Sequence, residues 1–436
     1  MELPTKLVVS TDRRFLGRDP ATPELLKLVG VNPEWADYIR VLDHQGTLAL
    51  LHYVNTWVSS TDHSINEAPL AEIGHVRGII VDTATGEIVC RSFPYTPEVV
   101  SEDPERIASL LPEDLSKVAF YNACEGTVLR LFWHNEEWHL STHRKINANN
   151  SYWAGPTFGS MFEELRTGFV LNNSEPGPDQ HSMDKNYCYV FLMSHNGNRL
   201  VYNISKPQLM LIAIYDRSTQ QFLSGEEYGP SHKLGPKRPA GCADPVPVTD
   251  INTVADLQEA VDELEKFASY NLAGIIAFPD SLDPRPVKIV NASYNNLRNA
   301  RGNEPSLRSR YIQLRGTPEG GLMIKWYNEP DYQEIFDNAE DEIDELVNRL
   351  HTMYMHRYVH KNIDELPKEE FVTLQRCHTW HTADRGNNIV TANKVREFLN
   401  TTPTHFLLVM LNRQRREQRE AARELEAADD VDEVVD

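Results

Sequence analysis

The fold is indicated by two neighbouring stretches, ACEGTVLR at residues 123–130 and STHRK at residues 141–145. Residues 127–133 and 138–142 are rich in β-branched, aliphatic and aromatic side chains, and a polar HNEE segment lies between them at 134–137. This spacing predicts an antiparallel hairpin whose first strand directly follows a glutamate and a glycine.

Strand-like segments recur on both sides of this hairpin. Residues 78–90 predict a second hairpin, because β-branched runs flank a turn sequence, TATG, at 83–86. Residues 187–193 and 199–204 predict a third. We also expect strands at 47–53, 209–215, 272–278 and 286–290, helices at 101–111 and 253–268, and an irregular loop at 228–248.

The pattern changes after about residue 330. Residues 335–356 and 393–399 have helical periods, and strand signals nearly vanish. We therefore expect an α+β fold, with antiparallel sheets and helices over 1–330, an all-helical C-terminal domain over 331–427 and a disordered acidic tail over 428–436.

The composition argues against several classes of protein. Lys and Arg number 43 against 64 Asp and Glu, a net charge of −21, which does not suit a basic coat for nucleic acid or anionic membrane. No apolar run approaches the ~18–20 residues of a membrane span, and the first residues lack the layout of a secretory signal. Five cysteines without a CxxC pair indicate neither a disulfide framework nor a zinc site. We expect a soluble, cytoplasmic protein of a reducing compartment.

The order of the motifs resembles ATP-dependent RNA ligases, especially the phage-type RNA ligase 1 family. EG at 125–126 matches the end of the family's Lys-x-Asp-Gly nucleophile motif, and 141–145 matches its later Ser-Thr-x-x-Lys-like segment. The other matching stretches are RGIIVD at 77–82, YVFLM at 189–193, NRLV at 198–201, LIAIYD at 211–216, AGII at 273–276 and PVKIVN at 286–291. The resemblance implies a nucleotidyltransferase fold with ATP and Mg²⁺ as cofactors, and a helical domain in the place of a substrate-specificity domain.

The sequence departs from the chemistry that this resemblance implies. In the family a lysine amine attacks the α-phosphorus of ATP, while carboxylates and further lysines hold the sugar, metal and phosphates. Here the nucleophile position holds Ala123, two glutamate positions hold Leu192 and Ala273, and Val290 replaces one lysine of a Lys-x-Lys strand in which Lys288 stands. Because alanine cannot form a phosphoramide, we expect lysine adenylation to be lost.

Such a protein would bind a nucleotide or an RNA end in the residual pocket. The candidate nucleotide-binding residues are Arg77, Glu125, Gly126, Arg130, Lys145, Arg199 and Lys288. A locally basic stretch at 281–316, with interleaved tyrosines, carries the candidate nucleic-acid-binding residues Arg298, Arg301, Arg308 and Arg310. The alternative for both sets is an ordinary strand-edge or solvated-surface role. No metal ligands are expected, since His356 and His360 are better explained as helix-surface or core histidines.

Three functions stay open from the sequence. The first is an RNA ligase-like protein that lacks lysine-adenylate chemistry and binds nucleotide or RNA ends. The second is an active ATP-dependent RNA ligase that uses a displaced lysine, such as Lys117 or Lys145. The third is a structural or assembly component, for example in the virion of a large DNA virus, that has kept only the ligase fold. RNA is a candidate partner of the basic stretch, and proteins are candidate partners of the helical domain.

Overall fold

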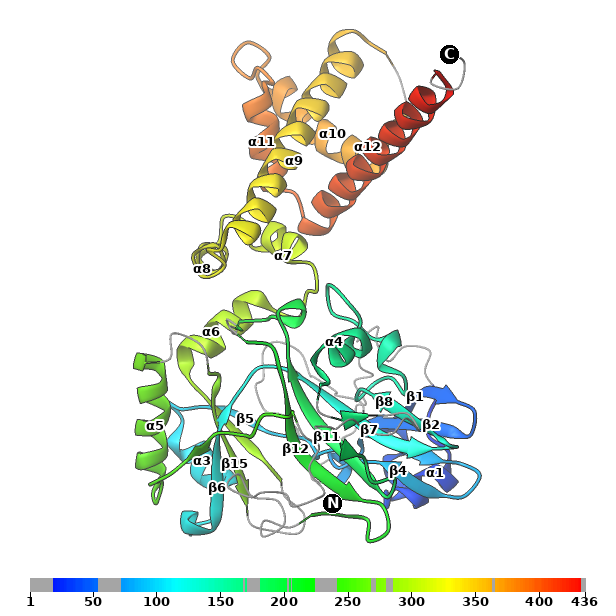
Figure 1. Cartoon of the computed structure of the whole chain (residues 1–436). Helices are drawn as coiled ribbons and strands as arrows, with labels where there is room; N and C mark the ends of the chain where they lie inside the picture. Colours follow the sequence, from blue (N-terminus) through cyan, green and yellow to red (C-terminus); the bar gives the residue numbers. More distant parts are fainter. Residues whose placement is uncertain are drawn as a thin grey trace. The chain divides into compact units, whose positions relative to one another are not determined.

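Antiparallel sheets dominate the first part of the chain, and helices make up the second (Figure 1). The computed structural model describes residues 19–53, 72–167, 169–170, 181–201, 204, 206–223, 241–267, 272–279, 285–362 and 365–432. The chain divides into two compact units, Met1–Arg298 and Asn299–Asp436. The predicted α+β class with a helical C-terminal part is confirmed.

The first sheet of the N-terminal unit has the strand order β1-β2-β3-β4. Its strands are β1 (Ile39–Gln45), β2 (Leu48–Tyr53), β3 (Arg77–Asp82) and β4 (Glu87–Cys90). Every residue of β2 is buried, and α1 (Pro23–Leu28) adds Leu25 and Leu26 to the same core. The predicted hairpin over 78–90 is confirmed as β3 and β4. A short 3-10 helix, η1 (Pro33–Tyr38), precedes the sheet.

The second sheet has the order β13-β12-β11-β7-β8. Its strands are β7 (Thr127–His134), β8 (Glu137–Ser141), β11 (Tyr187–Ser194), β12 (Gln208–Asp216) and β13 (Gln221–Phe222). The hairpin that the opening motif predicts is β7 and β8, and its turn residues Asn135 and Glu136 have positive φ. Helix α4 (Phe158–Leu165) packs Phe158, Met161 and Phe162 into the core of this sheet. The remaining elements of this region are η3 (Ala148–Asn150), β9 (Phe169–Val170), β10 (His181–Ser182) and η4 (Asn196–Asn198).

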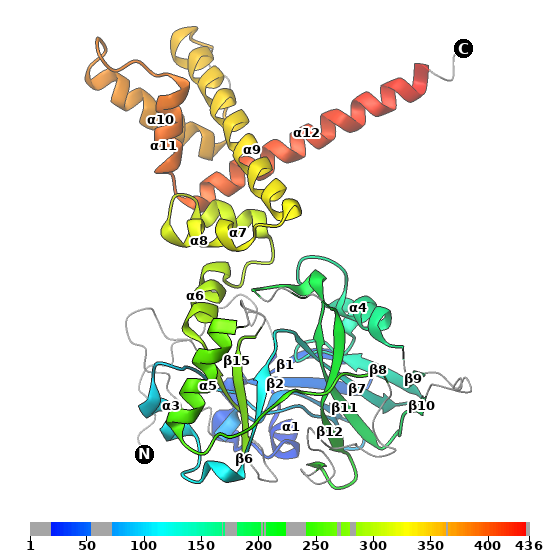
Figure 2. The ribbon, with the colours of Figure 1, turned by 60° about the vertical axis from the view of Figure 1, so that its left-hand side comes forward.

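The third sheet has the order β14-β6-β15-β16-β5 and is antiparallel except between β16 and β5. Its strands are β5 (Glu98–Val100), β6 (Val118–Ala123), β14 (Pro247–Val248), β15 (Gly274–Pro279) and β16 (Val287–Val290). Helices α3 (Pro104–Leu110) and α5 (Val254–Phe267) pack Ile107, Leu257 and Val261 against it (Figure 2). The 3-10 helix η2 (Leu115–Lys117) leads into β6.

The C-terminal unit is a helical cluster around one apolar core. Its helices are α7 (Leu307–Leu314), α8 (Pro318–Trp326), α9 (Pro330–Tyr354), α10 (Lys368–Ala383), α11 (Ala392–Asn400) and α12 (Thr404–Asp432). A π-helical turn, η5 (Met355–Val359), extends α9, and α6 (Ala292–Arg301) spans the division between the units. Within the described residues, no helix combines the length and apolar composition that a membrane span requires.

The division between the two units differs from the predicted boundary after residue 330, which lies inside the second unit. The reason is packing, because Tyr311 and Ile312 of α7 and Met323 of α8 are buried in the same core as Phe336 of α9. Of the predicted acidic tail over 428–436, the residues through Asp432 belong to α12, and the rest lies outside the described residues.

The predicted hairpin of 187–193 with 199–204 is wrong in its second strand. Strand β11 pairs instead with β12 and β7, and the described residues after η4 form no strand before β12. The physical reason is a competing hydrogen-bond acceptor, because the amides of Leu200 and Val201 donate to the carboxylate of Glu125. Most of the predicted loop over 228–248 lies outside the described residues, and its end contains β14.

Candidate functional site

The predicted nucleotide site is centred on the connection between two sheets. Residues 124–126 leave β6 of the third sheet and lead directly into β7 of the second. Both sheets therefore fix the position of Glu125 and Gly126, which carry the likeness to the ligase nucleophile motif.

The Glu125 carboxylate is buried and is hydrogen bonded by the protein itself. The backbone amides of Leu200 and Val201 donate to it, the second at 2.8 Å, and the Tyr294 hydroxyl of α6 donates at 3.2 Å. Arg199, another predicted binding residue, is half-buried and directly precedes these amides. Hydrogen bonds to an ionised acceptor are among the stronger ones in proteins. The carboxylate therefore fastens the β6–β7 connection to the segment after η4 and to α6.

Gly126 is required by close packing between strands. A Cβ at this position would lie 2.6 Å from the carbonyl oxygen of Met193 and 3.0 Å from Cδ1 of Leu192. The next residue, Thr127, pairs with Met193 where β7 begins to run beside β11. A larger residue would force these strands apart, so the glycine has a structural role whether or not a ligand binds.

The structure brings the four aliphatic replacements around this connection. In the strand register, Gly274 faces Ala123 on β6 and Val290 on β16. The amide of Ala273 donates to the carbonyl of Ala123 at 2.8 Å, and both alanines are buried. Leu192, from the second sheet, lies against Gly126. Uncharged side chains thus occupy the places where the family resemblance implies an amine and two carboxylates.

Lys288 is near Glu125 but is paired with another acid. Its Nζ atom lies 3.5 Å from Oε1 of Glu98 on the neighbouring strand and 5.5 Å from the ring centroid of Tyr294. Arg298 pairs with the same glutamate. Burial opposes ionisation of Glu98, but the charges of Lys288 and Arg298 hold its pKa below the ordinary value. Glu125, Tyr294, Lys288 and Glu98 therefore form one connected polar group.

Arg77 and Lys145, two more predicted binding residues, are held by contacts elsewhere in the same unit. The Arg77 guanidinium donates to the carbonyl of Pro94 at 3.1 Å and to the hydroxyl of Thr96 at 3.3 Å. The Lys145 ammonium lies 3.3 Å from a carboxylate oxygen of Asp43. These contacts therefore attach the first sheet to the segments that contain residues 94–96 and Lys145.

Arg130 is fully buried and donates to the carbonyls of Gly78 and Thr142. Gly78 has a φ of +70°, and a Cβ there would lie 2.7 Å from the carbonyl oxygen of His143. Within the part of the chain that the structure describes, no carboxylate pairs with Arg130, and its Nε atom has no hydrogen-bond partner. A buried cation is costly unless it is hydrogen bonded, and here the two carbonyls supply acceptors for the guanidinium.

Two histidines, the buried His52 and the half-buried His143, have lowered pKa values beside these arginines. Burial, together with the charges of Arg144, Arg77 and Arg130, lowers the pKa of His52 to about 3. Burial and the same arginines hold the pKa of His143 well below its ordinary value. Sequence reasoning missed both histidines, since their environment comes from residues distant in the chain.

The arginines of the basic stretch are mostly used inside the protein. Arg301 is buried and donates to carbonyls of the turn that follows it. Arg308 is buried and pairs with Glu342 of α9, and Arg310 donates to the carbonyl of Ala300 at 2.7 Å. The structure does not gather these side chains into one exposed track. Counting cations along the sequence could not anticipate these contacts.

The lysines considered as displaced nucleophiles are paired with aspartates. The Lys117 ammonium is exposed and lies 3.1 Å from Asp114, before the start of β6 and at the opposite end of that strand from Ala123. Lys145 pairs with Asp43, as described above. The sequence also gives no sign of the hydrogen bond from Tyr294 to Glu125, because this tyrosine stands out only as an aromatic side chain within the basic stretch.

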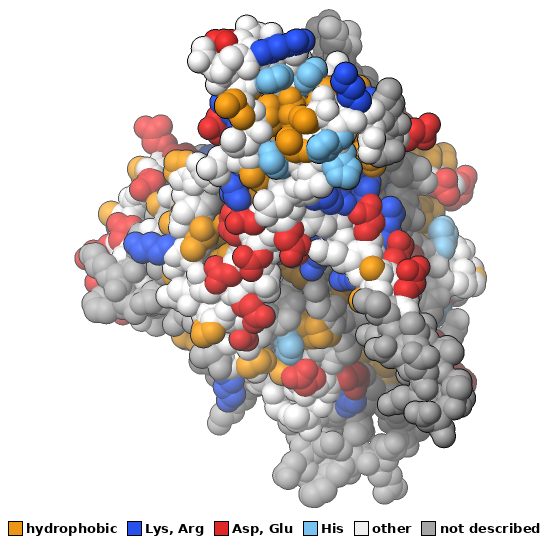
Figure 3. All heavy atoms as spheres, turned by 90° about the horizontal axis from the view of Figure 1, so that it is seen from above, with side chains coloured by type: hydrophobic (Ala, Val, Ile, Leu, Met, Phe, Trp, Pro, Cys, Tyr) orange, Lys and Arg blue, Asp and Glu red, His pale blue; other side chains and the backbone are white. Residues whose placement is uncertain are grey.

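Histidines gather beside apolar side chains on the face of the molecule shown in Figure 3. Among the described residues, His378 stacks on Tyr358 with ring centroids 3.9 Å apart, and His356 lies 5.9 Å from His360. His381 is hydrogen bonded to the carbonyl of Asn388 at 2.6 Å. No three histidine, cysteine or acidic side chains of the described residues are grouped to hold a metal ion.

Comparison with known proteins finds viral relatives. The chain is 24% identical over 331 residues to an immediate-early protein ICP-46 homolog of Invertebrate iridescent virus 6, covering 72% of this chain and 70% of that protein. It is 24% identical over 310 residues to a homolog of the same name from Invertebrate iridescent virus 3, covering 70% and 64%. It is 25% identical over 251 residues to the immediate-early protein ICP-46 of Frog virus 3 (isolate Goorha), covering 55% and 59%. The chain thus spans less than two thirds of the second and third relatives. No protein-family model matches it.

Similar solved structures include nucleic-acid ligases. A putative ATP-dependent DNA ligase from Aquifex aeolicus has 12% identity and a TM-score of 0.39, covering 82% of this chain and 88% of that one. An archaeal ATP-dependent RNA ligase has 13% identity and a TM-score of 0.38, covering 76% and 83%. A mutant RNA ligase of Naegleria gruberi with ATP and Mn has 12% identity and a TM-score of 0.30, covering 48% and 58%. These similarities are distant, and we base the proposals below on residues and their contacts.

Proposed function

We propose that this chain is an RNA ligase-like protein that binds a nucleotide or an RNA end without forming a lysine adenylate. The observation that carries the proposal is the commitment of the Glu125 carboxylate to the amides of Leu200 and Val201 and to the Tyr294 hydroxyl. In this role the carboxylate is a structural acceptor, and the positions around it are aliphatic.

Adenylation needs groups that these positions do not supply. A nucleophilic amine must reach the α-phosphorus of ATP, and carboxylates must hold the metal that offsets phosphate charge. Ala123 offers a methyl group, and Leu192 offers a branched hydrocarbon. Releasing Glu125 to bind a ligand would leave buried amides without an acceptor, which is unfavourable.

The cations near the site support binding of phosphate groups. Lys288 stands beside the Tyr294 ring, and Arg77 and Lys145 are half-buried cations of the same unit. We propose that ATP, with Mg²⁺ on its phosphates, or a 5′-phosphorylated RNA end is the ligand, and that Lys288 contacts its phosphate groups. RNA contacts at the basic stretch and protein contacts at the helical unit belong to the same proposal.

The viral relatives support a setting for this activity. They are named as immediate-early proteins, and we propose that this chain acts in the cytoplasm of an infected cell. If the chain instead has only an architectural role, we expect to find it in the virion.

Calorimetric titration tests the binding proposal. We expect measurable heat with ATP and Mg²⁺ or with a 5′-phosphorylated RNA oligonucleotide, and at least about a tenfold weaker affinity in Lys288→Ala, a loss of about 1.4 kcal/mol. Lys117→Ala is the matched control, because this exposed lysine pairs only locally with Asp114 and should leave the affinity unchanged. Absence of heat with both ligands would contradict the proposal and favour a structural or assembly role.

A further inference from the structure

Two cysteines from different sheets meet in the interior of the N-terminal unit. Cys90 ends β4 of the first sheet, and Cys188 lies in β11 of the second. Their Sγ atoms are 3.5 Å apart, with the Cys188 thiol donating toward Cys90, and both side chains are fully buried. The ligase resemblance assigns no role to either residue.

The polar surroundings of this pair favour a negative charge on Cys90. The Ser141 hydroxyl lies 3.8 Å from its sulfur. Burial opposes ionisation, but the Cys188 thiol, the Arg130 charge, the Ser141 hydroxyl and the more distant Arg217 together lower the pKa of Cys90. The thiol of Cys188 has a raised pKa, because burial and the neighbouring Cys90 disfavour a second thiolate. Of the two thiols, Cys90 is therefore the one that ionises more readily.

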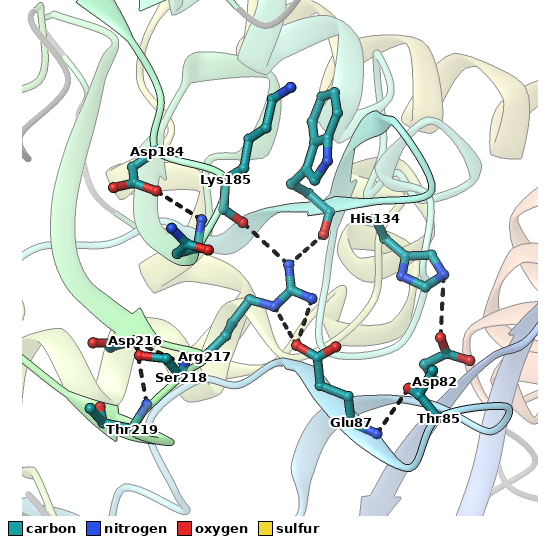
Figure 4. A network of polar contacts seen from close by, with 12 residues as sticks. Asp82, Thr85, Glu87, His134, Asp184, Lys185, Asp216, Arg217, Ser218 and Thr219 are labelled. Carbon is teal, nitrogen blue, oxygen red and sulfur yellow. Dashed lines mark hydrogen bonds and ion pairs between the residues drawn. The ribbon is translucent and has the colours of Figure 1, made fainter.

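The Arg130 charge is one of the influences that favour a thiolate on Cys90. Arg130 is fully buried, and among the described residues it has no carboxylate partner. The charge of Arg217 has a smaller influence on Cys90, and its guanidinium is bound to Glu87 at 2.6 Å and to the carbonyl of Trp133 at 2.7 Å (Figure 4). A thiolate is the reactive form of cysteine, so Cys90 is the sulfur that we expect to react first.

We propose that Cys90 and Cys188 form an oxidisable dithiol that closes to a disulfide when a small peroxide enters the unit. An S–S bond is about 2 Å long, so each sulfur must move by less than about 1 Å from the observed contact. The disulfide would join the first sheet to the second.

The reaction balances with one peroxide. The Cys90 thiolate attacks one oxygen of hydrogen peroxide and forms an S–O bond as the O–O bond breaks; the departing hydroxide takes up a proton and leaves as water. Cys188 then attacks the sulfenic sulfur, the S–O bond breaks, and the thiol proton leaves with the hydroxyl as a second water. The two cysteines lose two electrons, and the peroxide gains them.

Peptide mapping of the peroxide-treated full chain tests the proposal. After treatment with hydrogen peroxide, remaining thiols are alkylated under denaturing conditions and the peptides are analysed by mass spectrometry. We expect a Cys90–Cys188 disulfide in most molecules, reversed by dithiothreitol. Cys377 is the control, because it is buried alone in the helical unit and burial raises its pKa to about 11, so it should stay reduced. Full alkylation of both Cys90 and Cys188 after peroxide would overturn the proposal.

A variant identifies which sulfur reacts first. In Cys188→Ala, we expect peroxide to leave a sulfenic acid on Cys90 that is trapped by dimedone, and in Cys90→Ala we expect no adduct on Cys188. A dimedone adduct on Cys188 without one on Cys90 would contradict the assigned order. If either variant does not fold, peptide mapping of the chain with both cysteines still shows whether the Cys90–Cys188 disulfide forms.

Discussion

Two buried polar regions of the N-terminal unit solve the problem of charge in opposite ways. Around Glu125, backbone amides and a tyrosine hydroxyl donate hydrogen bonds to a buried carboxylate, and the neighbouring positions are aliphatic. Around Arg130, two carbonyls bind a buried guanidinium, and the low pKa of His52 keeps that neighbouring histidine uncharged. The Glu125 region, which resembles a nucleophile motif, is thus held by hydrogen bonds within the protein, whereas the proposed oxidisable dithiol lies where the first sheet meets the second.

The largest effect is expected from removing the Glu125 carboxylate. Glu125→Ala leaves two buried amides and a hydroxyl without their acceptor, so we expect the free energy of unfolding to fall by about 3–5 kcal/mol. Glu125→Gln is the matched control, since it keeps one oxygen acceptor and should lose about half as much. Urea denaturation measures both. A Glu125→Ala protein as stable as the original would mean that the carboxylate serves a ligand rather than the fold.

Glycine substitutions compare the two regions directly. In Gly78→Ala a Cβ would meet a backbone carbonyl and the residue would also need a φ of +70°, so we expect a loss of about 3–4 kcal/mol. Gly126→Ala meets a carbonyl without a left-handed φ, and we expect about 1–3 kcal/mol. The thermal midpoints of the two variants give the ranking. Equal losses would show that the approach of β3 to the β7–β8 hairpin is less tight than the contacts indicate.

The neutral histidines predict a pH dependence. The pKa of His52 is about 3 in the folded protein, below that of the unfolded chain, so protons bind preferentially to the unfolded state once the pH falls below about 6.5. Stability is therefore complete above that pH and is lost as the pH falls toward 3, at up to about 1.4 kcal/mol per pH unit for this residue. His52→Gln should flatten the dependence between pH 6.5 and 4.5 in urea titrations, whereas the exposed His360→Gln should not. If the free energy of unfolding falls equally with pH in His52→Gln and in the original protein, His52 is not neutral in the folded state.

The smallest effects are expected at the two lysines. The Lys145–Asp43 and Lys288–Glu98 pairs are partly exposed, so Lys145→Ala and Lys288→Ala should each lower the free energy of unfolding by about 0–1 kcal/mol. Circular dichroism during urea denaturation measures the change. This near-neutrality separates an effect on nucleotide affinity from a loss of fold. A loss above that range would make these lysines part of the structural framework.

The sequence predicted the elements whose signals are local. The hairpins over 78–90 and 127–142 depend on β-branched runs beside turn residues, and α5 depends on one apolar helical face. The gathering of Ala123, Ala273 and Val290 follows from motif order, because the matching segments become neighbouring strands.

The predictions failed where a distant residue competes. The segment at 199–204 lost its expected strand pairing because Glu125 takes its amides. Arg298 and Arg308 are predicted to bind nucleic acid, and the sequence gives no sign that Glu98 and Glu342 pair with them from remote positions in the chain. The pairing of Cys90 with Cys188 has no local signal at all, since the two residues come from separate sheets.

Incubation of the purified chain with α-labelled ATP and magnesium tests the central claim most directly. The aliphatic side chains around Ala123 predict that no acid-labile label stays on the denatured chain. Label retained on the chain, and lost in Lys117→Ala or Lys145→Ala, would contradict the claim and establish an active ligase with a displaced lysine.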